Sequence, residues 1–307
     1  MGRGAFGSWY AFTSATLLRA TPLILIGLGF AFALRAGALN IGAEGQFYAG
    51  AIAATWATLQ VAALPAPLAI ALTWLAGLAG GALWVLLPVV LRMRFGVLEV
   101  ISTLLLNFVA ESLVSLMVQG PLQEPGGIYP QSAAIPVAAR LPLLPGTRLH
   151  LGFLVALLLA AGLAFVVGRT VWGFRLRAAG AAPRAAELVG RVNPGRMGAI
   201  ALLASGAVAG LAGAIEVGGV SYALYQNLSP GYGFTAIAVA ILARGHPLGI
   251  VASGLLFGAL EAGAGAMQRE AGVPSVVVYV VEAALIVAVL LADRWARRTP
   301  EPGGARA

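Results

Sequence analysis

The sequence contains no lysine and no cysteine, although it has 307 residues and nineteen basic side chains. Without lysine the chain cannot form an ATP-hydrolysing phosphate-binding loop, because that loop uses a lysine to hold the phosphates. Without cysteine it has neither a disulfide nor a thiolate metal site. The two histidines, His150 and His246, are far apart and match no metal-ligand spacing. The single aspartate, Asp293, has no second aspartate with which to form an intramembrane catalytic pair.

Charged residues are scarce as well. Only 10% of residues are charged and 60% are hydrophobic, and the mean hydropathy is +0.92. A bilayer core about 30 Å thick requires roughly 20 apolar residues per helix, and the chain offers many such runs. We therefore predict an all-α, polytopic membrane helical bundle. The net charge of +8 is explained by arginines held on the cytosolic side, so we expect no nucleic acid partner.

About nine apolar runs are predicted to cross or enter the membrane, in a single transmembrane domain over residues 1–307. The run at 233–243 is too short to cross alone, at about 1.5 Å per residue. It either borrows flanking residues or is a half-helix buried among its neighbours, which is tolerated beside a cavity or within protein. The predicted runs are at about 12–34, 47–61, 67–91, 98–119, 151–168, 197–218, 233–243, 248–267 and 274–292.

The distribution of arginine predicts the orientation. If every run crosses and the carboxyl-terminal tail is cytosolic, fourteen of the nineteen arginines lie inside, as the positive-inside rule prefers. This arrangement places the amino terminus outside. It also makes 120–150, which is rich in proline and glycine, an external loop, and 169–196 a cytosolic loop.

The cytosolic loop Arg169–Arg196 holds six arginines and one acidic residue. Pro183 opens a short segment whose apolar and charged residues fall on opposite sides at helical spacing. We predict a short amphipathic helix that a partner protein binds. Its apolar residues are Ala185, Leu188, Val189 and Val192, and its charged residues are Arg184, Glu187 and Arg191.

The run at 98–119 carries a polar residue every fourth position. A four-residue step drifts about 40° per repeat on a 3.6-residue helix, which predicts a slanting polar band facing the protein interior. The band lines a path for a polar solute, or its amides and hydroxyls join neighbouring helices. For the residue at the helix start we favour a structural role, since the helix dipole favours an anion there. The band consists of Glu99, Thr103, Asn107, Glu111 and Ser115.

The segment Asn40–Gln46 contains two glycines, two amides and one acid within seven residues. Such residues are costly in a plain membrane span. Close backbone packing explains the glycines. The polar side chains indicate a shaped, hydrogen-bonded site at the start of a helix.

Several motifs occur in one order over nearly the whole chain. They resemble the permease subunits of bacterial nucleoside and simple-sugar ABC importers, and among these they are most similar to purine-nucleoside uptake permeases. The motifs are Asn40-Ile-Gly-Ala-Glu-Gly-Gln46, Glu99-Val-Ile-Ser-Thr103, Leu106-Asn107, Gly173-Phe-Arg175 with Gly180, Gly231-Tyr-Gly-Phe234, Ile237-Ala-Val-Ala240 and Pro247-Leu-Gly-Ile250.

The resemblance implies a transport subunit of the bacterial plasma (inner) membrane that is not itself an enzyme and holds no cofactor. Its implied partners are a cytosolic ATPase that binds ATP, a second permease, an extracytoplasmic solute-binding lipoprotein and membrane lipid. The implied coupling residues are Arg175, Arg177, Gly180, Arg184, Ala185, Ala186, Glu187 and Gly190. The hypothetical substrate-pathway residues are Asn40, Glu44, Gln46, Thr103, Asn107, Glu111, Tyr232 and Phe234.

Three alternatives remain at this point. The solute is a nucleoside or a ribose-like simple sugar. An ion-coupled secondary transporter would use Glu111 or Glu282 to bind the ion. An intramembrane hydrolase would use Ser205 or Ser253, but no histidine lies in a comparable span.

Members of the resembled family usually have one more span before the region matching Ser8–Pro22, so we expect an apolar helix encoded upstream of Met1.

Overall fold

The computed structural model describes residues 5–60, 63–188 and 192–272, with scattered residues between 274 and 291. In these parts of the chain the regular elements are helices, and three isolated β-bridges occur in the connecting segments. The longer helices are α3 (Leu17–Arg35), α4 (Ala43–Gln60), α5 (Ala66–Phe95), α6 (Glu99–Val118), α7 (Gly152–Arg169), α10 (Pro194–Glu216) and α12 (Pro247–Ala271). The shorter ones are α2 (Trp9–Ala11), η1 (Phe12–Thr16), η2 (Val137–Ala139), α8 (Val171–Ala181), α9 (Pro183–Leu188), η3 (Val217–Ser221) and α11 (Tyr232–Leu242).

Six helical stretches in the described residues are long and apolar enough to cross a membrane, which confirms a polytopic helical membrane protein. The six stretches do not include α4, and α11 is an apolar helix of only eleven residues. The predicted span 274–292 lies mostly outside the described residues. The six stretches are Trp9–Arg35, Ala66–Phe95, Glu99–Val118, Gly152–Arg169, Pro194–Ser221 and Pro247–Glu270.

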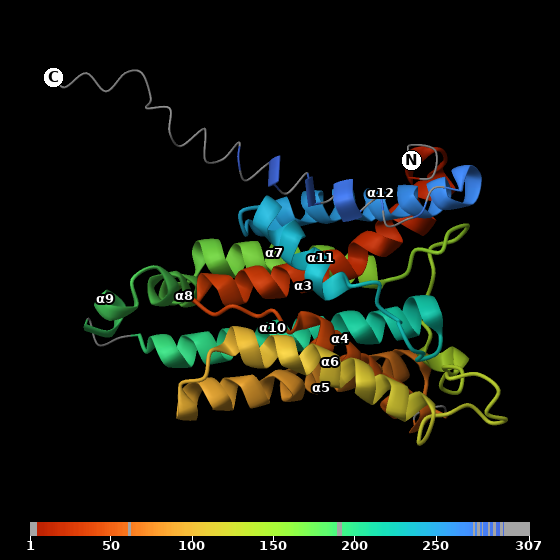
Figure 1. Cartoon of the computed structure of the whole chain (residues 1–307), viewed down its shortest axis with the longest axis horizontal. Helices are drawn as coiled ribbons and strands as arrows, with labels where there is room; N and C mark the ends of the chain where they lie inside the picture. Colours follow the sequence, from red (N-terminus) through yellow and green to blue (C-terminus); the bar gives the residue numbers. More distant parts are fainter. Residues whose placement is uncertain are drawn as a thin grey trace.

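The two loops predicted to lie on opposite sides of the membrane, 120–150 and 169–196, are at opposite ends of the bundle. Figure 1 shows the long helices running side by side, with α8 and α9 at one end and the segment 120–150 at the other. The chain between α3 and α4 does not stay at an end. It turns back into the bundle, so that α4 begins well inside it. Residues 36–42, which we call the return segment, are not helical.

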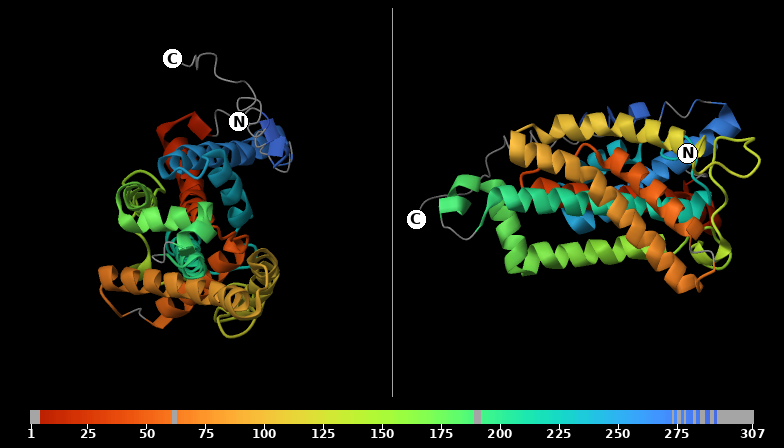
Figure 2. Two further views of the ribbon diagram at one scale, coloured as in Figure 1. Left: turned by 90° about the vertical axis from the view of Figure 1, so that its left-hand side faces the viewer. Right: turned by 90° about the horizontal axis from the view of Figure 1, so that it is seen from below.

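Helices α3 and α10 are buried along most of their length. In the end-on view of Figure 2 they lie between a layer containing α5 and α6 and a layer containing α12. Small residues permit this packing, because glycine lets two helix backbones approach closely. A Cβ on Gly210 would overlap the Gly77 carbonyl oxygen, and one on Gly81 would overlap that of Gly206. These contacts join α10 to α5.

Two local predictions about helix ends are corrected by the structure. The run predicted to end near residue 91 continues as α5 through Arg92–Phe95, and Gly96 ends the helix with φ of 66°. The loop 169–196, predicted to be cytosolic, contains two helices rather than one, since α8 precedes the expected α9. The Thr170 hydroxyl accepts a hydrogen bond from the Gly173 N–H at 3.1 Å and thereby caps α8.

The segment 120–150 is attached to the bundle through His150. Its imidazole Nδ1 accepts a hydrogen bond from the Gly152 N–H at 3.1 Å, and the ring packs where a Cβ on Gly219 would lie. Burial lowers the pKa of His150 to about 4. The ring is therefore neutral at physiological pH and can accept that bond.

We expect Gly210→Ala to lower the thermal midpoint of the detergent-solubilised protein, because the added Cβ overlaps backbone atoms of α5. The cost of such overpacking is about 1–3 kcal/mol. Gly162→Ala on α7 is the control, since its Cβ would meet nothing within 4 Å. Equal midpoints for the two variants would contradict the packing described here.

Candidate functional site

A cluster of buried amides and hydroxyls surrounds the return segment. The Asn40 Nδ2 donates to the Gln46 Oε1 at 2.7 Å and to the Ser205 Oγ at 2.9 Å. The Gln46 Nε2 donates back to the Asn40 Oδ1 at 2.9 Å. All three side chains are at most 1% exposed. The reciprocal bonds satisfy both amides and fasten the return segment to α4 and α10.

Helix α6 holds the same region from the other side. The Asn107 Oδ1 accepts from the Gly45 N–H at 2.8 Å, and its Nδ2 donates to the Ile41 carbonyl at 3.0 Å. A Cβ on Gly42 would lie 2.8 Å from the Thr103 side chain. The glycines of the motif therefore let α6 reach backbone groups that no helix satisfies.

Glu44, in the first turn of α4, extends to the start of α11. Its Oε2 accepts from the Gly233 N–H at 2.6 Å. Nearby, the Ser229 Oγ accepts from the N–H groups of Gly231 and Tyr232 at 3.1 and 2.9 Å. The first N–H groups of a helix have no partner within the helix, so these two side chains supply the amino-terminal cap of α11.

The eight hypothetical pathway residues therefore do not share one environment. Six are buried, namely Asn40, Glu44, Gln46, Thr103, Asn107 and Tyr232. Phe234 is 46% exposed, and Glu111 is exposed too. The prediction that the whole α6 band faces the interior is wrong for Glu111. The drift of the band carries it from the interior at Thr103 to the surface at Glu111.

Other polar side chains lie on the same surface of α6. Ser112 is exposed, and the Ser115 Oγ accepts from the Gln119 Nε2 at 2.8 Å and from the Gln226 Nε2 at 2.6 Å. These residues are close to Glu111 along the helix. An exposed carboxylate inside an apolar span is costly if it faces lipid, by about 2.5–3.5 kcal/mol. This surface therefore faces water or protein.

Glu99, at the start of α6, has the structural role favoured above. Its Oε1 accepts from the Arg92 Nη1 at 3.0 Å and from the Leu39 N–H at 3.3 Å. The carboxylate thus joins the end of α5 to the return segment.

At the opposite end from 120–150, α8 packs on the end of α3. Leu176 is fully buried in a cluster with Ala36 and Ala201. Arg177 donates to the Val167 carbonyl. A Cβ on Gly180 would overlap the Arg35 carbonyl oxygen and lie 2.8 Å from the Gly37 nitrogen. Sequence reasoning named Arg177 and Gly180 but missed Arg35, for which no motif gives a signal.

Helix α9 is mostly exposed. Ala186 is 9% exposed, whereas Leu188 is 88% exposed and Arg184, Ala185 and Glu187 are exposed as well. Arg175 and Val192 line two cavities of about 430 and 510 Å³ in this region. The apolar side of the predicted amphipathic helix is therefore only partly covered within the chain. Gly190 lies outside the described residues.

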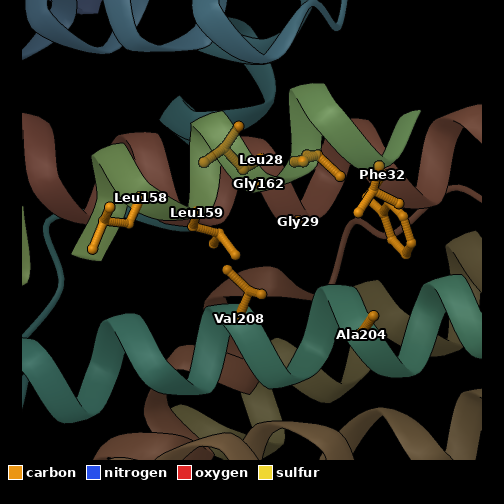
Figure 3. Close-up of a pocket in the computed structure, with 10 residues that line it drawn as sticks. Leu28, Gly29, Phe32, Leu158, Leu159, Gly162, Ala204 and Val208 are labelled. Carbon is orange, nitrogen blue, oxygen red and sulfur yellow. The ribbon is translucent and has the colours of Figure 1, made fainter. Parts of the chain in front are cut away.

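A third cavity, of about 310 Å³, lies between α3, α7 and α10 (Figure 3). Its lining is entirely apolar, so it offers a nucleoside or sugar no hydrogen bond and is not a candidate solute site. Within the described residues no cluster of three metal-ligating side chains occurs. The lining residues are Leu28, Gly29, Phe32, Leu158, Leu159, Gly162, Leu163, Val166, Ala204 and Val208.

Comparison with known proteins finds one matching family and several similar permeases. Residues 12–290 match the family described as branched-chain amino acid transport system / permease component. A guanosine ABC transporter permease protein of Bacillus subtilis is 38% identical, over 93% of this chain and 82% of that protein. A glucose ABC transporter permease protein of Haloferax volcanii is 37% identical, over 92% and 76%. A nucleoside ABC transporter permease protein of Lactococcus lactis is 32% identical, over 88% and 77%. No solved structure matches the chain.

We expect Asn107→Leu to destabilise the protein, because it leaves the Gly45 N–H and the Ile41 carbonyl buried without their partners. Each such group costs about 1–3 kcal/mol. Ser112→Ala, one turn further along α6 and exposed, should change the thermal midpoint little. A midpoint of Asn107→Leu equal to that of Ser112→Ala would show that the amide does not hold the return segment.

Proposed function

The chain belongs to the branched-chain amino acid transport system permease component family, and we propose that the solute it carries into the cell is a nucleoside. As an ABC importer permease it is a multi-pass membrane protein and not itself an enzyme. Membership of this family overturns the ion-coupled transporter and the hydrolase alternatives.

The similarity to guanosine and nucleoside permeases supports a nucleoside as the solute. The glucose permease of Haloferax volcanii, at 37% identity, lies between the guanosine permease at 38% and the nucleoside permease at 32%, so a simple sugar is the second candidate. Both solute classes present hydroxyl groups, and carboxylate and amide oxygens can accept hydrogen bonds from them. The nucleoside differs by its base, which an aromatic side chain can stack upon.

We place the solute path along the exposed polar surface of α6, with Glu111 as its central group. The exposure of Glu111 is the observation that supports this path most directly, because an exposed acid in an apolar span has to face water or protein rather than lipid. In this proposal a second permease subunit covers the other side of the path, and a solute-binding lipoprotein delivers the solute. Phe234, also exposed, is placed on the path. The six buried pathway candidates do not line the path directly and instead support the helices that line it.

The energy for transport enters through α8 and α9. Leu188 is the most exposed large apolar side chain in the described cytosolic loop, and a partner protein would cover it on docking. Arg175, Arg177 and Arg184 of the same loop are exposed as well. We assign the surface, with Gly180, Ala185, Ala186 and Glu187, to the contact with a cytosolic ATPase. The loop also contains Gly190.

The substrate class is tested by competition in proteoliposomes that contain the permease, its second permease and its ATPase, with the receptor added. We expect ATP-dependent uptake of radiolabelled guanosine to be suppressed by excess unlabelled nucleosides and not by equal concentrations of glucose or ribose. ATP-dependent uptake of radiolabelled glucose or ribose without uptake of guanosine would favour the second candidate. Uptake abolished by an ionophore and indifferent to ATP would contradict the proposal.

We expect Leu188→Glu to reduce the ATPase that co-purifies with the permease by about tenfold or more, since burying the new carboxylate costs more than the roughly 1.4 kcal/mol that a tenfold change represents. The side chain is 88% exposed, so the permease itself should fold normally. Ile128→Glu is the matched control, because this side chain is 78% exposed at the opposite end of the bundle. Undiminished ATPase binding by Leu188→Glu would remove α9 from the interface.

A further inference from the structure

Helix α11 is buried at its start, where Tyr232 and Gly233 lie inside the protein, whereas Arg244 in the turn after it is exposed. Its eleven residues extend for roughly 16 Å, about half of a bilayer core. It packs on α3, α12 and α4, and in Figure 1 it lies beside α3. Its buried start therefore depends on hydrogen bonds from the surrounding protein.

The Glu44 carboxyl group binds the start of α11, and the Arg35 guanidinium binds the turn that follows it. At its start the Glu44 Oε2 accepts from the Gly233 N–H at 2.6 Å. In the turn that follows it, the Gly245 carbonyl accepts from the Arg35 Nη2 at 2.9 Å. Hydrogen bonds with one charged partner are stronger than neutral ones. The two bonds thus fix the position of α11 along its own axis.

The turn after α11 is shaped for this contact. Arg244 and Gly245 both have positive φ, 51° and 68°. A non-glycine residue in this region is strained by about 1–3 kcal/mol and persists only where its surroundings hold it. Arg35 is part of those surroundings, since it binds the carbonyl of the second residue.

Arg35 and Glu44 flank the return segment directly. Arg35 is the last residue of α3 and Glu44 the second of α4, with residues 36–42 between them. Gly180 of α8 packs on this segment, because its Cα lies where a Cβ on Gly37 would make a contact of 3.2 Å. Phe32 and Trp172 add a stacked contact between α3 and α8, with 5.9 Å between ring centroids.

We propose that Arg35 and Glu44 form a clamp that makes α11, which carries Phe234 of the proposed path, follow the movement of α8. The inference rests on the proposed docking of an ATPase on α8 and α9. A displacement of α8 is passed through Gly180 to the return segment, and the clamp passes it on to both ends of α11. Arg35 is a positioning residue here, because it acts through the Gly245 carbonyl and does not contact the solute.

The first test compares Arg35→Met with Arg35→Lys in the assembled transporter. Methionine has no hydrogen-bond donor, whereas lysine keeps one. We expect Arg35→Met to lower uptake of radiolabelled guanosine at least about tenfold while the complex still hydrolyses ATP, and Arg35→Lys to restore most of the uptake. Arg94→Met is the matched control, because Arg94 is an exposed arginine in the last turn of α5. Arg35→Met with the uptake of the parent would overturn the clamp.

The second test replaces the clamp by a covalent bond. A Cβ on Gly245 would lie 3.9 Å from the Ala31 Cβ, within the range that a disulfide requires, and the chain has no cysteine of its own. In the Arg35→Met background, oxidation of the Ala31→Cys/Gly245→Cys pair should restore guanosine uptake, and a reductant should abolish it again. Each single cysteine variant controls for strain at Gly245. A formed disulfide that restores nothing would count against the clamp.

The third test addresses the contact with α8. Gly180→Ala should uncouple uptake from ATP hydrolysis, since the added Cβ overlaps the Arg35 carbonyl oxygen, whereas Gly168→Ala at the end of α7 meets nothing within 4 Å. Suppose that the parent complex takes up guanosine with ATP and that both Gly180→Ala and Arg35→Met show normal uptake. That result would overturn the clamp and leave the proposed function standing. A parent complex without ATP-driven uptake would instead overturn the proposed function.

Discussion

Backbone that is not helical cannot face lipid in a membrane protein and has to find hydrogen-bond partners in the surrounding protein or in a water-filled cavity. The return segment imposes this requirement on the bundle, and the neighbouring helices meet it. Asn107 of α6 binds the Ile41 carbonyl, Glu99 accepts from the Leu39 N–H, and Asn40 binds Ser205 of α10. Polar residues that are costly in a span are kept at these positions because each one satisfies a group that would otherwise be unpaired.

Much of the fold could be predicted from the sequence because span length and glycine spacing are local properties. The apolar runs gave helices whose ends agree with α5, α6, α7 and α10 to within about one turn. The polar set at Asn40–Gln46 correctly indicated a hydrogen-bonded site at a helix start. Helix α8 was not predicted because it carries no clear apolar periodicity. The role of Thr170 as its cap is recognisable only from the hydrogen bond that the Thr170 hydroxyl accepts from the Gly173 N–H.

The candidate site was less predictable, because a polar residue in a span is costly whether it lines a path or joins two helices. Burial and partners separate the two cases, and both depend on other helices. Asn107 and Glu111 lie one step apart in the same band, yet the first is buried with two backbone partners and the second is exposed. Arg35 was counted only as a positive charge at the inner end of a span. Its partner, the Gly245 carbonyl, is 210 residues away.

The clamp follows from the same requirement that explains the return segment. Because α11 is too short to cross a bilayer, its start lies inside the protein. Moving the helix away from Arg35 or Glu44 would break a hydrogen bond and leave a buried backbone group unpaired, at about 1–3 kcal/mol each. A displacement of the return segment therefore costs less when α11 moves with it than when either bond breaks. The glycine contact of α8 on Gly37 is stiff, since backbone atoms meet without an intervening flexible side chain. A small movement at the cytosolic loop is then delivered to α11 rather than absorbed on the way.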